Sequence, residues 1–355
     1  DGNGGTDLSF ISLTINPVND APTAVADFFA TDEDTALSQN VITGGNLPDS
    51  DIDGDAITVT EVNGTAANVG VQITLASGAL LTLQADGSFV YDPNGAFEVL
   101  SDGEVDSDTF DYTLSDGTLT DQTTVTIDIT GINDAPIPFD DAFTVNEDAA
   151  GTSNDVLVND VDPEGDSLTV IDGGDVTISD TLFVFSSDGR EAAIDLGAGG
   201  LASFDGQGNF EELGDGETDT VTFTYQIADA DSISAIDTAT VTYTITGEND
   251  PTTVTANTLT LNEGQTVVLG TGNFNATDPD TNDVLTFNVS GVTGGSFQLV
   301  SDSSVVTSFT LTQGPASAIQ FVHDGSEAAP TFMTSVNDGT ANTAPAAATI
   351  NYTPL

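Results

Sequence analysis

The sequence predicts an all-β protein built from antiparallel β-sandwich domains in tandem. Val, Ile, Thr and Phe alternate with polar residues over short runs, as they do in strands that bury one face. Turns rich in Gly and Asp separate these runs, and no helical periodicity of useful length occurs. The chain has 355 residues, enough for several compact domains, and its hydrophobic fraction of 38% argues against the disorder that strong acidity can cause.

A linker phrase that occurs three times sets the domain boundaries. It reads Asn-Asp-Ala-Pro at 19–22 and 133–136 and Asn-Asp-Pro at 249–251, and an alternating apolar strand precedes it each time. Pro lacks an N–H group and therefore ends strand pairing at these points. Repeats this far apart each have their own core, unlike those of a solenoid. We expect the last strand of a preceding repeat at 1–18, then repeat 1 at 19–132, repeat 2 at 133–248 and repeat 3 at 249–355.

Each repeat carries the same acidic elements in the same order. A Glu follows the linker, an acidic loop comes next, an Asp-Gly turn with a Glu lies further on, and another Asp follows a strand 14 residues after the first Asp of that turn. Any one of these clusters is more typical of an ordinary turn than of a ligand set. The shared order and spacing favour carboxylates that meet at fixed places. With the linker Asn and Asp, the residues are Asn19, Asp20, Glu33, Asp51, Asp53, Asp102, Glu104 and Asp116; Asn133, Asp134, Glu147, Asp162, Glu164, Asp215, Glu217 and Asp229; and Asn249, Asp250, Glu263, Asp278, Asp280, Asp324, Glu327 and Asp338.

The charge of the chain points to bound cations. There are 58 Asp and Glu residues against 1 Lys or Arg, and the formal net charge is −57. Two unpaired carboxylates about 4 Å apart repel by roughly 4 kcal/mol at an effective dielectric constant of ~20. Basic groups of the chain cannot relieve this repulsion, so screening salt or divalent cations must. Calcium is the hard cation that carboxylate and amide oxygens usually bind. The alternative, a solubilising surface adapted to salt, explains the total charge but not its repeated spacing.

Composition also excludes several partners. An acidic surface excludes nucleic acid as a direct partner and disfavours anionic lipid. No apolar run approaches the ~20 residues of a membrane span, so direct membrane insertion is not expected. The chain has no Cys, which rules out disulfides and thiolate metal sites. It opens inside a pattern, Asp-Gly-Asn-Gly, so we expect a fragment of a longer protein.

The ordered set of acidic elements resembles cadherin repeats, and in particular the bacterial cadherin-like and VCBS-type tandem repeats of giant surface adhesins of the RTX-adhesin type. Residues 91–97 (Tyr-Asp-Pro-Asn-Gly-Ala-Phe) and 108–117 (Asp-Thr-Phe-Asp-Tyr-Thr-Leu-Ser-Asp-Gly) look like VCBS repeats. Residues 321–326 (Phe-Val-His-Asp-Gly-Ser) and 336–339 (Val-Asn-Asp-Gly) resemble the repeat of chondroitin-sulfate proteoglycan cores. The resemblance implies cadherin-like, Ig-like Greek-key sandwiches arranged end to end, outside the cell or on its surface.

The resemblance further implies structural calcium ions at the junctions between neighbouring repeats. Ligands of the first junction would be Glu33, Asp102, Glu104, Asn133, Asp134, Asp162, Glu164 and Asp229. Ligands of the second would be Glu147, Asp215, Glu217, Asn249, Asp250, Asp278, Asp280 and Asp338. A half-site at the start would comprise Asn19, Asp20, Asp51, Asp53 and Asp116. A second half-site, formed by Glu263, Asp324 and Glu327, would await a following repeat.

Some positions depart from the family pattern. Glu164 stands where the other repeats have Asp, and Asp229-Ala230-Asp231 replaces Asp-Gly. Glu263 is followed by Gly instead of Asp, and the linker of repeat 3 lacks its Ala. We expect weaker sites or fewer ions there.

Two functions remain open. The first is a calcium-rigidified spacer or stalk of a large bacterial adhesin, which serves cell adhesion or attachment to a biofilm or matrix. The second is an adhesion module that binds a surface glycan or another copy of the chain, for which the least repeat-like stretch, Val176 to Asn209, is the candidate. Enzyme activity is not expected, because catalytic carboxylates need one special environment with split pKa values instead of equivalent copies in each repeat.

A few remaining residues are given ordinary structural roles. We expect Asp34, Asp148 and His323 at the surface, and Arg190 at the surface in a pair with Glu191 or a nearby Asp. The 19 Phe residues recur at strand spacing and are expected in the cores.

Overall fold

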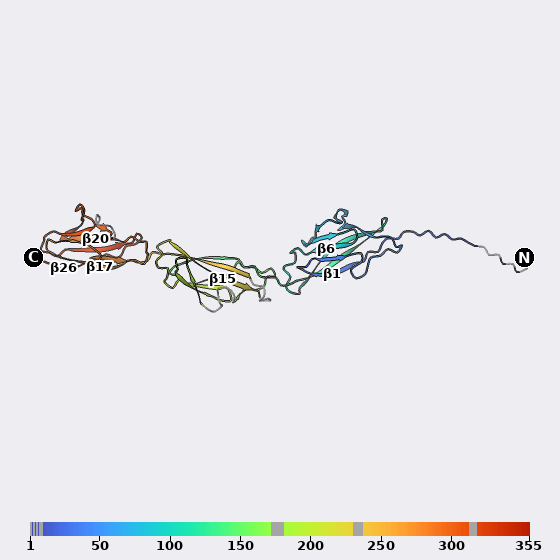
Figure 1. The fold of residues 1–355 in the computed structure, drawn as a ribbon, viewed down its shortest axis with the longest axis horizontal. Helices are drawn as coiled ribbons and strands as arrows, with labels where there is room; N and C mark the ends of the chain where they lie inside the picture. The colour runs from blue at the N-terminus through green and yellow to red at the C-terminus, as the bar shows by residue number, and fades with distance from the viewer. Residues whose placement is uncertain are drawn as a thin grey trace. The chain divides into compact units, whose positions relative to one another are not determined.

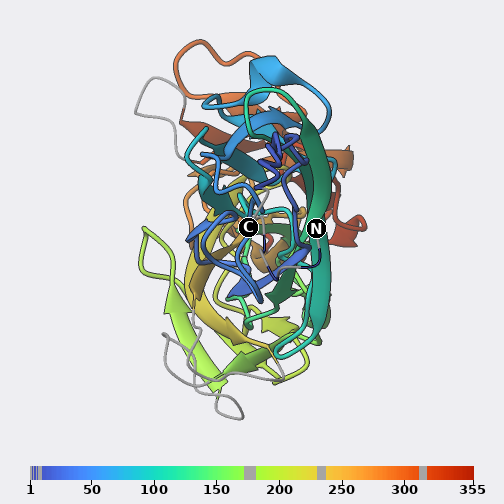
Figure 2. The ribbon, with the colours of Figure 1, turned by 90° about the vertical axis from the view of Figure 1, so that its right-hand side faces the viewer.

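The computed structural model describes residues 2, 4, 6, 10–171, 181–229, 237–311 and 318–355, and its fold is almost entirely β (Figures 1 and 2). In this part of the chain the one helical element is a single 3-10 turn, Ala66–Asn68. The predicted all-β class is therefore confirmed. The chain divides into two compact units: unit 1 holds Asp1–Ala135, Val161–Ser167 and a segment that begins at Asp229, and unit 2 holds Pro136–Asp160, Leu168–Ala228 and Ile236–Leu355.

Repeat 1 is a sandwich of two four-stranded sheets. One sheet has the order β1-β8-β7-β3, formed by β1 (Asp27–Asp32), β8 (Thr120–Thr130), β7 (Val105–Ser115) and β3 (Thr58–Val62). The other has the order β2-β6-β5-β4, formed by β2 (Leu37–Asn40), β6 (Ser88–Asp92), β5 (Leu80–Leu83) and β4 (Ile73–Thr74). Strands β1 and β8 pair in parallel, with Asp27 opposite Val125. The first and last strands of the repeat therefore run side by side in the same direction.

The core of repeat 1 follows from the alternation along its longest strands. On β7, Phe110, Tyr112 and Leu114 are 2%, 0% and 0% exposed, and Val125 and Ile127 of β8 are fully buried beside them. Burial of a side chain of this size stabilises the fold by about 1.5–3 kcal/mol. The period of two places the intervening polar residues on the outer face.

Repeat 2 has the same arrangement. Its sheets have the orders β11-β15-β16-β9 and β10-β14-β13-β12. The strands are β9 (Asp141–Asn146), β10 (Ala150–Asp155), β11 (Thr169–Ile171), β12 (Thr181–Phe185), β13 (Glu191–Leu196), β14 (Leu201–Asp205), β15 (Thr218–Ala228) and β16 (Asp237–Thr246). Strands β9 and β16 pair in parallel, as β1 and β8 do. Phe223, Tyr225 and Ile227 of β15 take the core positions of Phe110, Tyr112 and Leu114.

Repeat 3 is a sandwich of shorter strands. Strand β17 (Thr253–Asn262) pairs with β19 (Phe274–Thr277) and, in parallel, with β26 (Thr349–Thr353). The other sheets are β18-β23-β21 and β22-β20-β24-β25. Their strands are β18 (Thr266–Val268), β20 (Thr286–Thr293), β21 (Gly295–Leu299), β22 (Ser308–Phe309), β23 (Ile319–His323), β24 (Thr331–Asn337) and β25 (Ala346–Ala347). Six Phe side chains in mutual contact fill the core: Phe274, Phe287, Phe297, Phe309, Phe321 and Phe332.

The prediction that Phe residues form the cores is correct for most of them but not for all. Phe10, Phe28, Phe139, Phe183 and Phe185 are half or more exposed. Phe28, Phe183 and Phe185 lie on strands with the outer-face phase of the alternation, where the pleat directs them away from the core.

Residues 10–18 lie outside any strand, and their apolar side chains are exposed, including Ile11 at 91% and Leu13 at 79%. Among the described residues no helix is long and apolar enough to cross a membrane.

Candidate metal centres

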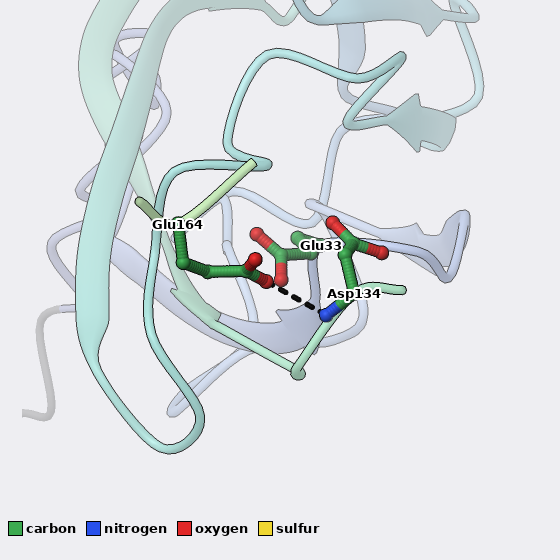
Figure 3. Close-up of side chains that lie close together, drawn as sticks. All are labelled: Glu33, Asp134 and Glu164. Carbon is green, nitrogen blue, oxygen red and sulfur yellow. Dashed lines mark hydrogen bonds between the residues drawn. The ribbon is translucent and has the colours of Figure 1, made fainter. Parts of the chain in front are cut away.

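Three carboxylates meet at the first linker, within unit 1. Glu33 directly follows β1, Asp134 belongs to the linker, and Glu164 lies in the acidic loop of repeat 2 (Figure 3). One oxygen atom of each lies within 4.8 Å of the others. Glu33 is only 2% exposed. Glu33 lies here because β1 and β8 pair in parallel, so the end of β1 lies beside the end of β8, the last strand of the repeat. The Glu33 N–H continues this pairing and donates to the Thr130 carbonyl over 3.1 Å.

Backbone and amide groups of the linker fix the orientation of these carboxylates. The Ile132 N–H donates to Glu33 Oε1 over 2.7 Å, and the Asp134 N–H donates to Glu164 Oε1 over 2.7 Å. The Asn133 side chain donates to the Asp134 carbonyl over 2.8 Å and to Asp229 Oδ2 over 3.1 Å. The Asn-Asp phrase therefore fixes two carboxylates: the Asp134 N–H holds one oxygen of Glu164, and the Asn133 amide holds one oxygen of Asp229.

Four carboxylate oxygens at this linker are buried without a hydrogen-bond partner: Glu33 Oε2, Asp134 Oδ2, Asp162 Oδ2 and Glu164 Oε2. A buried acceptor left without a partner costs about 1–3 kcal/mol, and more when it is charged. Native proteins rarely keep such groups together unless water or an ion satisfies them. The donor set consists of carboxylate oxygens, which are the ligands that Ca²⁺ takes, so these residues fit that ion.

The second linker, within unit 2, repeats this arrangement. The Glu248 N–H donates to Glu147 Oε1 over 2.6 Å, and the Asp250 N–H donates to Asp280 Oδ2 over 3.0 Å. The Asn249 side chain donates to the Asp250 carbonyl over 2.9 Å. Again the remaining oxygens, Glu147 Oε2, Asp250 Oδ2 and Asp280 Oδ1, are buried and unpartnered.

A third group forms on the side of repeat 3 that faces its linker. Asp278, Asp283 and Asp338 bring one oxygen each within 4.8 Å of one another. The Thr252 hydroxyl lies 2.5 Å from Asp278 Oδ2 and 3.2 Å from Asp338 Oδ2. A hydroxyl has one proton and can donate to only one of them. Backbone N–H groups hold the other oxygens, those of Thr340 and Ala341 at Asp338 Oδ1 and that of Asp280 at Asp278 Oδ1. Within the described part of the chain, the group therefore has neutral donors but no positively charged partner among its hydrogen bonds.

The half-site predicted at the start has the same geometry. The Asn19 side chain donates to Asp116 Oδ2 over 2.8 Å, and the Asp20 N–H donates to Asp53 Oδ2 over 2.8 Å. Asp51 Oδ1 accepts the Asp53 N–H, while Asp51 Oδ2 is buried without a partner.

Other predicted ligands do not join these groups. Asp102 and Asp215 are in none of the groups of three carboxylates found among the described residues. Glu104 accepts the Ser101 N–H of its own turn. Glu217 accepts the Gly214 N–H of its own turn with one oxygen and the Asn282 amide of the repeat 3 acidic loop with the other. Of the terminal half-site, Glu263 accepts the Leu355 N–H over 3.0 Å and Asp324 accepts the N–H of Ser326. The departure at Ala230 and Asp231 lies outside the described residues.

Sequence reasoning missed a second group at the first linker and one further carboxylate, Glu211, near the second. Asp34 and Glu98 bring oxygens within 4.8 Å of Asp134, although the sequence assigns Asp34 an ordinary surface role. Burial, followed by a side-chain hydrogen bond with Glu98 and then by the charge of Glu98, raises the pKa of Asp134 to about 6. Burial and the neighbouring Asp250 and Asp148 likewise raise the pKa of Glu211. A signal was present, because Glu98 and Glu211 each lie four residues before the first Asp of their turn.

The raised pKa values of carboxylates at both linkers indicate that their charged forms are unfavourable in the absence of a cation. Burial, opposed by one backbone hydrogen bond and reinforced by the charges of Asp250, Glu211 and Asp280, raises the pKa of Glu147 to about 7. Burial also raises the pKa of Glu33, Glu164 and Asp280. Two causes act together, desolvation and mutual repulsion, and a bound divalent cation relieves both.

A glycine at the end of the last strand lets each acidic turn approach its linker. A Cβ atom on Gly131 would lie 2.4 Å from the Ser101 carbonyl oxygen and 2.5 Å from that of Leu100. Gly131 also donates its N–H to the Glu104 carbonyl over 2.8 Å and accepts the Gly103 N–H over 3.0 Å. Gly247 occupies the same position in repeat 2.

Replacement of Gly131 by Ala is expected to destabilise repeat 1 by about 1–3 kcal/mol, because the added methyl group forces the turn away from the strand. Urea unfolding of Gly131→Ala measures this loss. Gly103→Ser is not a clean control, since its φ of +75° adds strain. Gly199→Ala, which has open space around its Cβ, is the matched control and should change stability little. An unchanged midpoint for Gly131→Ala would contradict the close approach.

The expectation that His323 lies at the surface is wrong. It is 4% exposed and stacks on Tyr352 with ring centroids 5.2 Å apart. Its Nδ1 accepts the N–H groups of Gly264 and Gly325 over 3.1 and 3.0 Å. The imidazole therefore ties the acidic turn of repeat 3 to the segment after Glu263. The sequence could not show this, because the two donors are backbone groups 61 residues apart in the chain, brought together by β-pairing.

Comparisons with known proteins agree with this geometry. A family model described as a bacterial cadherin-like domain matches residues 19–131 and 133–247, which is more than half of the chain. A second model, described as cadherin-like, matches residues 251–352. A search of the curated proteins gave no match.

Several solved structures resemble the chain at low identity. The mouse clustered PcdhgC3 EC1-3 structure is 13% identical, with coverage of 93% of this chain and 99% of that one and a TM-score of 0.48. Mouse Cadherin-23 EC22-24 is 14% identical, with coverage of 95% and 100% and a TM-score of 0.44. Protocadherin Gamma B2 cadherin domains 1-5 are 14% identical with a TM-score of 0.45, and the match covers 95% of this chain and 60% of that structure.

The family matches confirm the resemblance to bacterial cadherin-like repeats, while the finer resemblance to VCBS and chondroitin-sulfate proteoglycan repeats stays a prediction. Cadherin-like domains are adhesion or structural modules, are typically extracellular and generally bind Ca²⁺. The order of acidic elements, the sandwich with parallel first and last strands, and the family matches lead to one assignment. The chain belongs to the bacterial cadherin-like family, with two bacterial cadherin-like domains followed by a cadherin-like third.

Proposed function

We propose that the chain is a calcium-rigidified spacer within a large bacterial surface or secreted adhesin, and that it serves cell adhesion or attachment to a biofilm or matrix. The observation that supports this most is the set of buried carboxylate oxygens without a partner at each linker. Eight of these atoms belong to residues predicted as ligands: Glu33, Asp51, Asp134, Glu147, Asp162, Glu164, Asp250 and Asp280.

The ligand groups suggest more than one ion at a linker. Ca²⁺ takes six to eight oxygens at about 2.3–2.6 Å. At the first linker Asp134 belongs to two groups, one with Glu33 and Glu164 and one with Asp34 and Glu98. A carboxylate shared in this way has one oxygen for each of two ions. The proposed repeats, 19–132, 133–248 and 249–355, place these groups where one repeat gives way to the next.

A cation at the linker would restrict its bending. Without metal, the carboxylates from the two sides repel each other, and this repulsion disfavours the close approach of neighbouring repeats. With metal, the same carboxylates become shared ligands, and separation of the repeats requires that they dissociate. The structural role of the ion would therefore be to lock one repeat onto the next.

Small-angle X-ray scattering of the whole chain tests this proposal. Addition of millimolar Ca²⁺ to chelator-treated protein is expected to sharpen the distance distribution and to increase the maximum dimension, at constant ionic strength. Mg²⁺ is the control, because it demands octahedral geometry and keeps its water, and should not reproduce the change. A maximum dimension that is the same with and without Ca²⁺ would sink the proposal.

One observation favours the alternative function, that of a ligand-binding module. In the described part of the stretch Val176 to Asn209, Phe183 and Phe185 of β12 are 50% and 61% exposed on one face of the strand. Aromatic rings with this spacing can stack on sugar rings or on another protein. A glycan array and a sedimentation measurement, each with the Phe183→Ser variant as control, separate this function from that of a pure spacer.

A further inference from the structure

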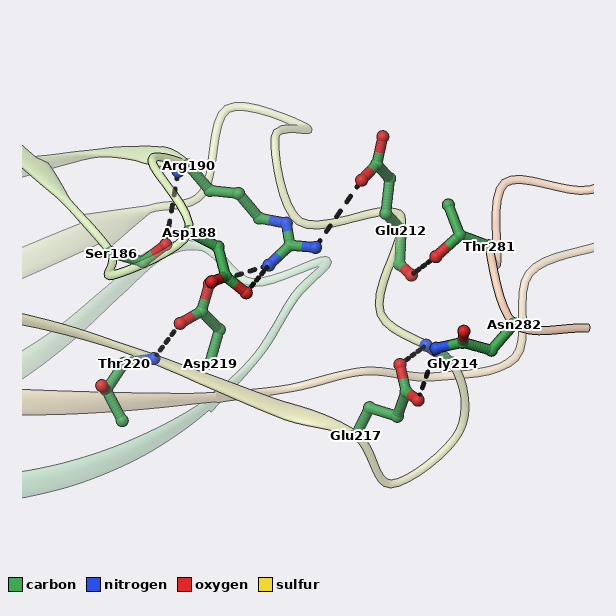
Figure 4. A network of polar contacts seen from close by, with 10 residues as sticks. All are labelled: Ser186, Asp188, Arg190, Glu212, Gly214, Glu217, Asp219, Thr220, Thr281 and Asn282. Atoms are coloured by element: carbon green, nitrogen blue, oxygen red, sulfur yellow. Dashed lines mark hydrogen bonds and ion pairs between the residues drawn. The ribbon is translucent and has the colours of Figure 1, made fainter.

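Arg190 is the one Lys or Arg in a chain with 58 acidic residues, and its surroundings differ from the expected surface pair. Its side chain is only 18% exposed. The guanidinium does not pair with Glu191. Instead it lies 2.9 Å from Asp219 Oδ2, 3.5 Å from Asp188 Oδ2 and 3.6 Å from Glu212 Oε2 (Figure 4). The expected pair with a nearby Asp is present at Asp188, but the side chain is largely buried instead of lying at the surface, and the shorter ion pair with Asp219, 29 residues away, could not be foreseen.

The three acidic partners come from three separate segments of repeat 2. Asp188 and Arg190 lie on the hairpin between β12 and β13, where the Arg190 N–H donates to Ser186 Oγ over 3.3 Å. Asp219 lies near the start of β15 and is 8% exposed. Glu212 belongs to the segment Phe210–Glu217, which also carries the candidate ligands Glu211, Asp215 and Glu217.

The same segment contacts the acidic loop of repeat 3, within unit 2. The Glu212 backbone carbonyl accepts the Thr281 N–H over 3.4 Å and the Thr281 hydroxyl over 3.3 Å. The Glu217 side chain accepts the Asn282 amide over 2.8 Å (Figure 4). Thr281 and Asn282 lie between Asp280 and Asp283, two carboxylates of the second linker. A continuous series of contacts therefore joins Arg190 to the loop that would hold the ion.

The first linker lacks such a cation, since repeat 1 has no Lys or Arg. Its corresponding hairpin is tied to β7 by neutral donors: Ser77 donates to Asp108 Oδ2 over 2.6 Å, and the Tyr91 hydroxyl donates to the same atom over 3.1 Å. The two linkers thus share their carboxylates but differ in one positive charge.

We propose that Arg190 is a positioning residue of the second linker, a built-in counter-ion that holds the segment Phe210–Glu217 against the acidic loop of repeat 3 when no metal is bound. Without the guanidinium, Asp188, Glu212 and Asp219 would repel each other, and Asp219 would be a buried carboxylate without a counter-charge. The guanidinium is suited to this role because it is planar and can pair with several carboxylates at once. The part of the inference that concerns calcium rests on the proposed function, whereas the part that concerns the metal-free state does not.

Hydrogen exchange measured by mass spectrometry on the full chain tests the inference. In chelator, Arg190→Gln is expected to exchange at least tenfold faster than wild type in peptides that cover 210–217 and 279–284, and to exchange normally in a peptide that covers 98–104. Asp195→Asn is the matched control, because Asp195 is exposed on β13 of the same repeat and is not among the three acidic partners of Arg190, and it should leave all three peptides unchanged. Millimolar Ca²⁺ should restore protection in Arg190→Gln.

Further variants separate positioning from simple fold stability. Arg190→Lys keeps a positive charge near Asp219 but loses the second guanidinium nitrogen, which faces Glu212. Exchange of 279–284 in this variant should lie between that of wild type and that of Arg190→Gln. Arg190→Lys also tests the inference if Arg190→Gln does not fold. Normal exchange of 279–284 in chelator-treated Arg190→Gln or Arg190→Lys overturns the inference, even if the core of repeat 2 exchanges faster. Faster exchange that Ca²⁺ fails to reverse supports the role of Arg190 and counts instead against calcium at the linker.

Discussion

Replacement of Glu33 by Gln is expected to have opposite effects on stability with and without calcium. In chelator, the variant should melt at a higher temperature than wild type, because it removes one charge from a group of buried carboxylates that repel each other. In millimolar Ca²⁺, it should melt lower, because a ligand with a net charge is lost. The amide keeps a carbonyl oxygen for the Ile132 N–H, so the local geometry is preserved.

The size of the calcium effect follows from linkage. A ligand present at 100 times its dissociation constant stabilises the folded state by about 2.7 kcal/mol, and 1 kcal/mol shifts the melting temperature of a domain near 100 residues by about 4–8 °C. Calcium should therefore raise the wild-type melting temperature by about 10 °C or more for each occupied site. Differential scanning calorimetry in Ca²⁺ and in chelator measures both effects.

A matched control is available in the same repeat. Glu61 on β3 accepts a hydrogen bond from Thr113 and lies in none of the carboxylate groups found among the described residues. Glu61→Gln should respond to Ca²⁺ as wild type does. If Glu33→Gln lowers the melting temperature equally in Ca²⁺ and in chelator, Glu33 is a structural residue and no ligand.

Repeats 1 and 2 are expected to lose stability as the pH rises from about 4 toward 7, and Asp27→Asn should remove a large part of this loss in repeat 1. Glu33, Asp49 and Asp134, whose pKa values are also raised, should account for the rest. The Tyr112 hydroxyl lies 2.8 Å from Asp49 Oδ2 and 3.3 Å from Asp27 Oδ2. Its single proton can go to only one of them. Asp49 also accepts the Val25 N–H, which favours its charged form, so Asp27 is the residue that must carry its own proton.

Repeat 2 contains a related arrangement. The Tyr225 hydroxyl lies 2.7 Å from the Val156 carbonyl oxygen, 3.0 Å from Asp160 Oδ2 and 3.1 Å from Asp141 Oδ2, so its proton has a backbone acceptor as well as the two carboxylates. Asp160 also accepts the Phe139 N–H. Burial and then the charge of Asp49 raise the pKa of Asp27 to about 7. In repeat 2, burial raises the pKa of Asp141 to about 6; a hydrogen bond from Tyr225 opposes this increase, and the charge of Asp160 adds to it.

The sign of the pH dependence follows from these pKa values. Between the unfolded pKa of 3.8 and the folded value, the native state binds a proton that the unfolded chain releases. The stability that this proton provides is complete below 3.8 and is lost as the pH rises through about 6 in repeat 2 and about 7 in repeat 1. A tenfold difference in proton affinity between the folded and unfolded states is worth about 1.4 kcal/mol, so the loss in repeat 1 is of order 4 kcal/mol. Urea unfolding in chelator, across this pH range, measures it.

Repeat 3 supplies an internal control for this prediction. Thr334 occupies the position of the tyrosine, and its hydroxyl donates to Asn257, which stands where the other repeats have Asp27 and Asp141. Its unfolding should therefore depend less on pH. In Asp27→Asn the amide can donate to Tyr112 at any pH, so this variant should be more stable than wild type at pH 8 and similar to it near pH 4. An equal slope for the variant and wild type would show that Asp27 does not hold the proton.

Sequence patterns identified what is periodic and local in this fold. Alternation located the core of β7 and β15, because a pleated strand allows only two faces. The linker phrase and the early Glu marked the places where Asp134 and Glu33 meet, because each repeat presents them in the same order. Such features can be recognised in the sequence because each depends on a single strand or a single turn.

What the patterns missed depends on contacts between distant segments. Glu98 joins Asp134 only because the segment before the acidic turn folds back to the linker, and Asp102, which looked the better ligand, is in none of the groups found among the described residues. His323 is held in place by two backbone N–H groups. Almost every residue type has such a donor, so the sequence gives no sign of this contact. The pairing of Tyr112 with Asp27 and Asp49 spans 85 and 63 residues, and no short motif indicates it.

The parallel pairing of first and last strands bears on how each repeat would respond to pulling. In repeat 2, β9 and β16 lie side by side from Asp141 opposite Val241 to Asn146 opposite Thr246. Tension applied where the chain enters β9 and leaves β16 draws the two strands in opposite directions along their common axis. The ladder is then loaded in shear, so its bonds share the load and must fail together, whereas a hairpin pulled from its open end unzips one bond at a time. A tether under flow would gain its mechanical resistance from this one pairing, in every repeat that has it.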